Sequence, residues 1–217
     1  MKLILSLLTV IMLVGCATIE AVTNIEEPAY KLLRQDGDFE LREYNAMIIA
    51  EVTVRGTLDE ASGRGFRLIA DYIFGNNLAR SSPAGEKIAM TAPVTMTRDG
   101  EKIAMTAPVT MTPANSAAPD TWRMHFVMPS RYTMATLPTP KNAAVKLREV
   151  KPQQVAALRF SGFSGEEKVA EKTAQLNEWM AKASLSASGL PQLARYNMPL
   201  TPPPFRRNEI LIPLATP

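Results

Sequence analysis

Residues 39–44 (FELREY) and 48–56 (IIAEVTVRG) set a pattern that returns 106 residues later (147 − 41) as residues 145–150 (VKLREV) and 155–162 (VAALRFSG). The tripeptide Leu-Arg-Glu at 41–43 matches the one at 147–149, and Gly56 matches Gly162, with no gap between them. Each copy is typical of two strands joined by a short turn. The chain is therefore predicted to contain two similar halves.

A helix is predicted to follow each pair of strands. Residues 57–60 (TLDE) and 164–167 (SGEE) both have the form of a capping box, a hydroxyl followed three residues later by Glu. Gly63 and Gly65 would either weaken the first helix or mark a place where something packs against bare backbone. Two more strands are predicted after each helix, the first pair near Ile88 and at 122–128 and the second at 192–198 and 209–214. The expected fold class is α+β: two quasi-repeated ββαββ halves, about 29–135 and 140–215, forming a twisted antiparallel sheet or barrel with two helices.

A sharper repeat lies inside the first half. Residues 85–97 (GEKIAMTAPVTMT) recur unchanged at 100–112, with a period of 15 (100 − 85). Apolar residues alternate along each copy, and Asp-Gly at 99–100 is a strong hairpin signal, which predicts an extended hairpin with Met96 opposite Ile103. The copies also supply four of the twelve Met residues, which would be either core fillers or soft thioether ligands for Cu(I) or heme: Met90, Met96, Met105 and Met111.

The N-terminus has the features of a secretory signal, with Lys2 before an apolar run from Leu3 to Val14. The ending Leu-Val-Gly-Cys at 13–16 is similar to a bacterial lipobox, in which Cys16 becomes the lipidated first residue of the mature protein. We expect a signal peptide at 1–15, a tether at 16–28 and a single domain at 29–215. Several acyl chains on Cys16 would anchor the protein stably in a lipid bilayer. Because Ala17 is not Asp, the resemblance to lipoprotein sorting implies the cell envelope, at the outer membrane facing the periplasm.

Composition excludes several classes of function. A formal charge of +3 without a Lys/Arg run argues against a nucleic-acid partner. The single Cys excludes a disulfide framework and a cysteine-cluster metal site. The usual spacings of catalytic and phosphate-binding motifs are missing from the sequence, so we predict a protein that is not an enzyme.

With these pieces in place, the chain resembles the SOUL/heme-binding protein family, as a bacterial lipoprotein member. The resemblance rests on motifs that follow one another in order over roughly residues 28 to 215: YKLL at 30–33, FELREY at 39–44, KIAMTAPV at 87–94, FVMP at 126–129, VKLRE at 145–149, ARYN at 194–197 and RRNEI at 206–210. It implies an α+β barrel-like domain of two quasi-repeated halves. It also implies non-covalent binding of heme or another tetrapyrrole in an apolar cleft beside the first helix.

Carried over by position, the resemblance implies a set of cofactor-binding residues. Phe66, Ile69, Ala70 and Ile73 would form the apolar wall, and the propionate partners would be Arg64, Arg67 and Arg206. The other interpretations are ordinary core packing for the wall and a solvated helix face for Arg64 and Arg67. His125, the single His, is a candidate axial ligand to the heme iron, or else a half-exposed strand residue.

Two functions from different classes follow from this sequence. The first is a membrane-anchored envelope protein that carries, buffers or senses a tetrapyrrole. The second is a structural or interaction lipoprotein that keeps the fold without the pocket, suggested by Asp71, Pro203 and Pro204 at positions where the resemblance implies cations. A binder of another small hydrophobic ligand is a third alternative. Protein partners are not indicated by the sequence.

Overall fold

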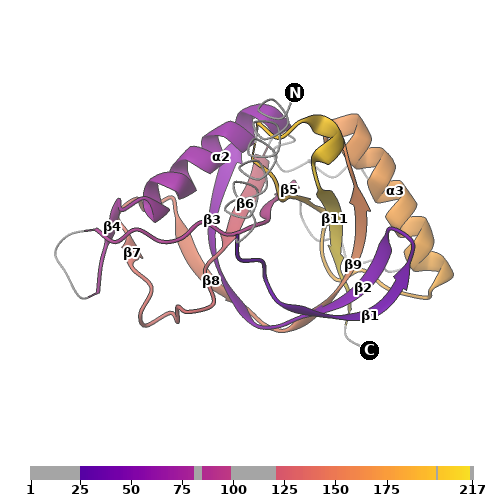
Figure 1. Ribbon diagram of the computed structural model, residues 1–217, viewed down its shortest axis with the longest axis horizontal. Coiled ribbons are helices and arrows are strands. Elements are labelled where there is room, and N and C mark those ends of the chain that lie inside the picture. Colours follow the sequence, from indigo (N-terminus) through magenta and orange to yellow (C-terminus); the bar gives the residue numbers. More distant parts are fainter. Residues whose placement is uncertain (1–24, 81–84, 99–120, 199, 216–217) are drawn as a thin grey trace, which may run out of the picture.

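The computed structural model describes residues 25–80, 85–98, 121–198 and 200–215. A nine-stranded, strongly curled antiparallel sheet carries two helices, α2 (Leu58–Ile73) and α3 (Glu166–Lys182), on one face (Figure 1). The strands lie in the order β1 (Tyr30–Asp36), β2 (Phe39–Tyr44), β9 (Gln153–Phe160), β11 (Asn208–Pro213), β10 (Gln192–Arg195), β5 (Val94–Arg98), β6 (Thr121–Val127), β3 (Met47–Arg55) and β8 (Lys146–Val150). A short second ribbon pairs β4 (Asn77–Leu78) with β7 (Thr139–Pro140). The predicted fold class is confirmed.

The two predicted halves are present, but their strands pair differently from the prediction. We expected β2 to pair with β3, and β8 with β9, across short turns. Instead β2 pairs with β9, and β8 with β3, so each half lends its first strand to the other. The registers repeat with the sequence: Leu41 lies opposite Ala156, and Leu147 opposite Ala50, each 106 residues from its counterpart (156 − 50). Exchange of strands joins the two halves in one continuous sheet.

The strand expected near Ile88 begins later, at Val94. Both edges of β5 are occupied by described strands, because Met96 lies opposite Met124 of β6 and opposite Leu193 of β10. The predicted pairing of Met96 with Ile103 involves the second copy of the repeat. The apolar side chains of the first copy were expected to share one buried face, and this is confirmed only in part. Met96 is 2 % exposed, whereas Met90 is 36 % exposed. The second copy lies outside the described residues.

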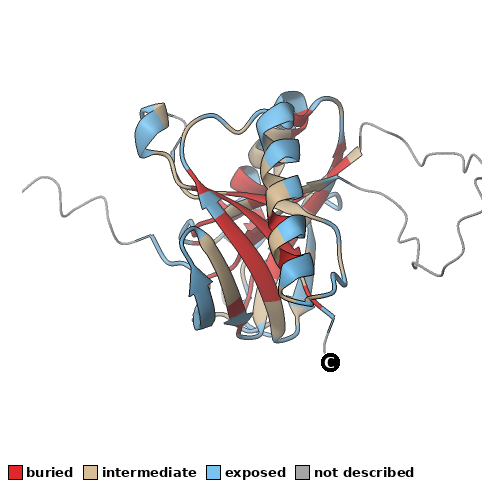
Figure 2. Ribbon diagram, turned by 90° about the vertical axis from the view of Figure 1, so that its right-hand side faces the viewer, coloured by how far each residue is buried: buried red, intermediate tan, exposed pale blue. Residues whose placement is uncertain are grey.

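The helices cover the main core, and their N-termini meet. The capping box of α2 is confirmed, with the Glu60 amide donating to the Thr57 hydroxyl. The second capping box is wrong, because Gly165 is the N-cap of α3 and its first turn receives no side-chain cap. Gly65 lets α2 approach β6, since a Cβ there would lie 2.9 Å from the Met124 sulfur. Figure 2 shows that α3 covers buried strands and that its outer face is exposed.

The face of the sheet turned away from the helices contains a buried ion pair. Arg42 of β2 donates from Nη1 and Nη2 to both oxygens of Glu209 on β11, at 2.6 and 3.0 Å. The two side chains are 1 % and 0 % exposed. Arg207 and the Tyr196 hydroxyl also bond Glu209, at 2.9 and 2.7 Å. This network joins strands of the two halves without using the helices.

Residues 25–29 cross this same face as an N-terminal strap. The Glu26 carbonyl accepts from the Ala92 amide at 3.0 Å, and its carboxylate accepts from the Ser130 amide at 2.7 Å. Glu27 forms an ion pair with Arg207 at 3.0 Å. We expected the tether to reach residue 28, whereas residues 25–28 lie against the domain. Residues 1–24, with the expected signal peptide and Cys16, lie outside the described part of the chain.

We predict that Arg42→Met lowers the free energy of unfolding by about 3 kcal/mol, because it leaves the Glu209 carboxylate buried without its bidentate partner. Urea unfolding followed by tryptophan fluorescence measures this. Arg34→Met is the control, because its ion pair with Asp36 is exposed, and the midpoint should change little. The double variant Arg42→Met/Glu209→Leu should recover much of the loss, and a double variant no more stable than Arg42→Met would contradict the prediction.

Candidate functional site

A basic hollow of about 350 Å³ lies between the N-terminal ends of the two helices. We call it the arginine hollow. Asp59 comes from α2, and Phe163, Ser164 and Gly165 come from the chain just before α3, while the strands β10 and β11 and their connection supply the rest. Its lining includes three cations and one acid, together with Phe163 and Met198: Asp59, Phe163, Ser164, Gly165, Arg195, Asn197, Met198, Arg206, Arg207 and Asn208.

Arg195 is the central cation of the arginine hollow. Its Nε donates to the Ser164 hydroxyl at 2.9 Å, its Nη1 to the Ser62 hydroxyl at 3.1 Å and its Nη2 to the Ser164 carbonyl at 3.2 Å. All three partners are neutral. Burial lowers the pKa of the Arg195 guanidinium, although the charge of Asp59 opposes that shift. A half-buried guanidinium with neutral partners is suited to receive an anion.

The helix ends add to this electrostatic preference. The Leu58 amide at the start of α2 donates to the Glu166 carboxylate of α3 at 3.3 Å, so the two N-termini are adjacent. Helix N-termini carry partial positive charge, and the first turn of α3 has no side-chain cap. Acids in both first turns reduce the effect: Asp59, Glu60, Glu166 and Glu167. The hollow is thus suited to one or two carboxylates at the end of a larger ligand.

The structure separates the residues that the resemblance implied as one site. Ile69 and Ile73 are 0 % and 1 % exposed within the core, and Ala70 is also buried. Phe66 is partly buried and packs on Phe126, with 5.7 Å between ring centroids. These residues do not line the arginine hollow or the larger cleft described below.

The three predicted cations also lie apart. Arg67 is exposed on α2, and Arg64 donates to the Arg55 carbonyl and lies 3.8 Å from Glu60. Arg206 lies in the arginine hollow, where its Nε donates to the Thr201 carbonyl at 2.7 Å. Sequence reasoning missed Arg195, although it stands in the quoted stretch 194–197. Its proximity to Ser62 and Ser164 follows only from the packing of both helices over β10.

His125 lies on the face of the sheet opposite the helices. It is half-buried beside Glu51 of β3 and Thr95 of β5, and it lines a small hollow of about 50 Å³. Its neighbours Met124 and Phe126 belong to the core beneath α2. The sheet therefore stands between His125 and the predicted α2 wall.

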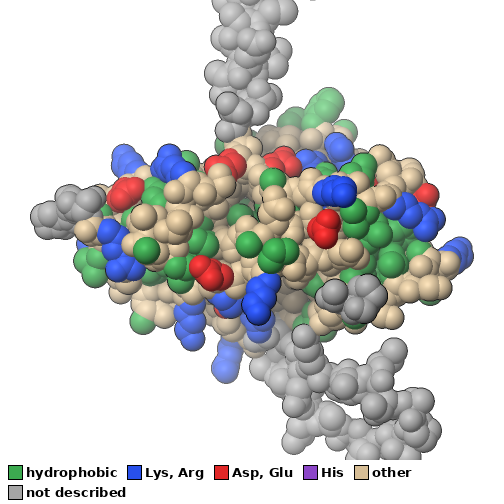
Figure 3. Space-filling model, turned by 90° about the horizontal axis from the view of Figure 1, so that it is seen from below, with side chains coloured by type: hydrophobic (Ala, Val, Ile, Leu, Met, Phe, Trp, Pro, Cys, Tyr) green, Lys and Arg blue, Asp and Glu red, His purple; other side chains and the backbone are tan. Residues whose placement is uncertain are grey.

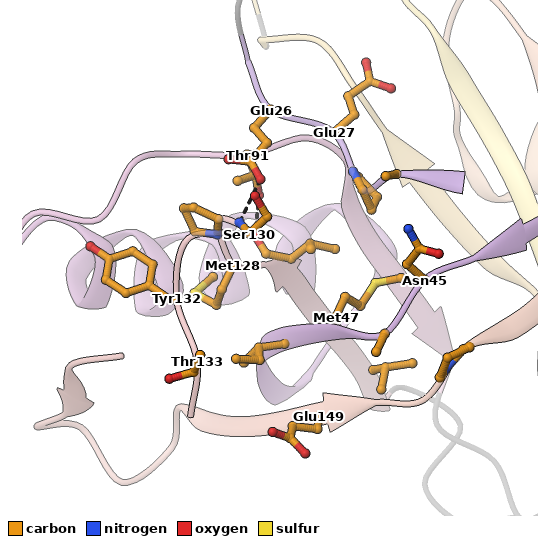
Figure 4. A pocket seen from close by; sticks show the side chains of 18 of the residues that line it. Glu26, Glu27, Asn45, Met47, Thr91, Met128, Ser130, Tyr132, Thr133 and Glu149 are labelled. Carbon is orange, nitrogen blue, oxygen red and sulfur yellow. Dashed lines mark hydrogen bonds between the residues drawn. The ribbon is translucent and has the colours of Figure 1, made fainter. Parts of the chain in front are cut away.

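A larger cleft of about 700 Å³ opens beneath the N-terminal strap (Figure 4). Its walls are largely apolar and come from the strap, the β2–β3 corner, the segment after β6 and the β8–β9 turn. Met47, Met128 and Tyr132 border it, and the hydrogen bond from the Ser130 amide holds Glu26 at its rim. The ionisable groups of its lining that carry charge at neutral pH are three acids and one base: Glu26, Glu27, Glu149 and Lys151. This excess of acidic over basic side chains does not suit an anionic ligand.

Comparison with known proteins identifies the family. The model of the SOUL heme-binding protein family matches residues 25–100 and 95–213. The chain belongs to this family. The two matched ranges overlap beside the 15-residue duplication, and together they cover both halves of the SOUL domain. A search of curated proteins found no match.

Solved structures share the fold at low sequence identity. The C-terminal domain of EcmrR is 10 % identical with a TM-score of 0.56, over 87 % of this chain and 99 % of that one. A hydrolase from Listeria innocua is 9 % identical with a TM-score of 0.54, over 84 % and 94 % of the two chains. An uncharacterized conserved protein from the same organism is 11 % identical with a TM-score of 0.52, over 90 % and 96 %. These likenesses concern the fold alone.

We predict that His125 stays neutral to unusually low pH. Burial lowers its pKa from 6.5 to about 4, with Glu51 opposing the shift and Arg148 and Arg123 adding to it. Since the unfolded chain binds this proton more readily, the contribution of His125 to stability should fall as the pH drops from 6.5 towards 4. His125 gives a single imidazole signal, so an NMR titration of its ring protons measures the pKa directly. A midpoint near 6.5 would contradict the prediction.

Proposed function

We propose that this SOUL protein binds heme or a related tetrapyrrole non-covalently at the arginine hollow, as a carrier, buffer or sensor. The observation that carries the proposal is Arg195, a half-buried cation with neutral partners beside Arg206 in a member of a heme-binding family. Binding alone is proposed, without a catalytic step.

The residues of the hollow fit the carboxylates of such a ligand better than its ring. Arg195 and Arg206 would hold the propionates through charge-assisted hydrogen bonds. Phe163, 71 % exposed, and Met198, 57 % exposed, would contact one face of the macrocycle. A hollow of about 350 Å³ encloses only part of a tetrapyrrole, so most of the ring would lie at the surface. The bound group would supply the light absorption and redox chemistry of a metallated ring.

Hemin titration of the chain lacking residues 1–16 tests this function; that chain retains every described element. We expect saturable binding below about 10 µM, followed by the Soret band and tryptophan quenching. Arg195→Gln should weaken binding about tenfold, because it removes a charge-assisted hydrogen bond worth roughly 1.5 kcal/mol.

Two control variants show whether hemin binds at the arginine hollow or elsewhere on the domain. Arg34→Gln alters an exposed arginine of β1, away from the hollow, and should bind hemin like the parent chain. His125→Ala should leave the Soret spectrum unchanged, because the sheet lies between His125 and the hollow. Absence of saturable binding in the parent chain would overturn the heme function, and equal affinity of the Arg195→Gln variant would overturn the site.

A specific observation favours each of the two other functions. Ile69 and Ile73 of α2 are packed in the core, which favours a structural or interaction lipoprotein. The cleft beneath the strap, at about 700 Å³ and largely apolar, favours a different small hydrophobic ligand. In the hemin titration, a structural or interaction lipoprotein would show no saturable binding. A binder of another small hydrophobic ligand would bind hemin with an affinity that is insensitive to Arg195→Gln.

We also propose that acyl chains on Cys16 anchor the protein in the cell envelope, at the outer membrane facing the periplasm. The sequence 13–16 (LVGC) supports this, and no helix in the described ranges is long and apolar enough to span a bilayer.

We predict that Cys16→Ser, expressed in a Gram-negative host, moves the protein from the membrane to the soluble fraction and abolishes labelling by palmitate. Fractionation and metabolic labelling measure the two effects. Ala17→Asp should keep the label while moving the protein to the inner membrane. Unchanged labelling of the Cys16→Ser variant would exclude this residue as the attachment point.

A further inference from the structure

Four strongly exposed apolar side chains gather on two neighbouring loops above the arginine hollow. Phe163 follows β9, and the other three belong to the connection between β10 and β11. Their exposed fractions are 71 % for Phe163, 57 % for Met198, 93 % for Leu200 and 76 % for Phe205. We call this group the apolar tip. Leaving such large side chains in water is unfavourable unless a partner covers them.

The apolar tip is held in place by hydrogen bonds between its loops. The Gly162 amide donates to the Pro203 carbonyl, and the Asn208 side chain donates to the Gly162 carbonyl, both at 3.0 Å. The Arg206 guanidinium lies over the Phe163 ring, 5.5 Å from its centroid. The exposed side chains therefore project from a supported surface.

Arginine side chains lie next to the apolar tip. Arg206 and Arg207 follow directly after Phe205, and Arg195 lies beneath them in the arginine hollow. In Figure 1 the β10–β11 connection lies at the top, between the upper ends of α2 and α3. The lower face of the molecule is different, with acids and bases interspersed among small apolar areas (Figure 3). Exposed apolar side chains with arginine beside them are suited to the interface of an anionic bilayer.

One residue of the N-terminal strap is bonded to an arginine next to this surface. Glu27 is bonded to Arg207, the neighbour of Arg206, at 3.0 Å. Ile25 lies nine positions after Cys16 (25 − 16), a span of at most about 30 Å. A chain fixed to a bilayer at that distance would keep the apolar tip within reach of the same bilayer.

We propose that the apolar tip is a membrane-docking surface, which inserts Leu200 and Phe205 into the interfacial region of a bilayer containing anionic lipid. Arg206 would then contact the headgroups. The contact orients the domain with the arginine hollow towards the membrane. It does not depend on tetrapyrrole binding, because neither Leu200 nor Phe205 lines the hollow.

The test is co-sedimentation of the chain lacking residues 1–16 with vesicles, without heme. Vesicles of phosphatidylcholine with about 30 % phosphatidylglycerol should bind it, and pure phosphatidylcholine should bind it more weakly. Raising the salt should weaken the binding to the anionic vesicles. The variant Leu200→Ser/Phe205→Ser should lose binding about tenfold or more, because it removes most of the apolar area that inserts.

Phe74→Ser is the matched control, because Phe74 is 59 % exposed at the end of α2, away from the apolar tip. It should bind the vesicles like the parent chain. Equal binding of the Leu200→Ser/Phe205→Ser variant, or equal losses in both variants, would overturn the proposal. The proposal would also be overturned if the parent chain did not bind vesicles and formed a dimer that the Leu200→Ser/Phe205→Ser variant did not form. The tip would then join two copies of the chain.

Hemin titration of the same variants keeps the two proposals apart. If the heme function fails, the parent chain still sediments with anionic vesicles. If docking fails, the parent chain still binds hemin and responds to Arg195→Gln.

Discussion

The buried pair between Arg42 and Glu209 is the interaction on which the arrangement of the two halves depends. Arg42 belongs to the first half and Glu209 to the second, and each side chain is almost fully withdrawn from water. Burial alone would raise the pKa of the Glu209 carboxyl. The hydrogen bonds and charge of Arg42, with the charge of Arg207, outweigh burial and hold that pKa below its ordinary value of 4.5. The stabilisation is therefore present at neutral pH and is lost as the carboxyl protonates in acid.

The same network joins the fold to the candidate site. Glu209 and Glu27 both bind Arg207, which lines the arginine hollow, and Glu27 belongs to the strap that crosses the sheet. The counterpart of Arg42 in the second half, Arg148, pairs instead with Glu51 at the surface, and its side chain is 51 % exposed. The duplicated halves are thus alike in backbone and different in electrostatics.

Much of the fold could be predicted from local pattern. The Leu-Arg-Glu repeat, the alternation of strands and the capping box at Thr57 all rest on neighbours in sequence, and the structure confirms them. One expectation failed where distant strands compete for an edge. β2 and β3 follow one another but pair with β9 and β8, and both edges of β5 are taken by β6 and β10. Strand pairing across more than a hundred residues leaves no local signal.

The candidate site, like the fold, could be predicted from the sequence only in part. The sequence by itself determined the α+β class and the duplication, because both follow from residue order and periodicity, and its ordered motifs carry the resemblance to a heme-binding family. Only the tertiary structure decided that Ile69 and Ile73 fill the core, that His125 lies across the sheet from α2, and that Arg195 stands between Ser62 and Ser164. These facts depend on which face of a strand meets which helix. That is settled by the packing of the two halves against each other, and no short stretch of the chain encodes it.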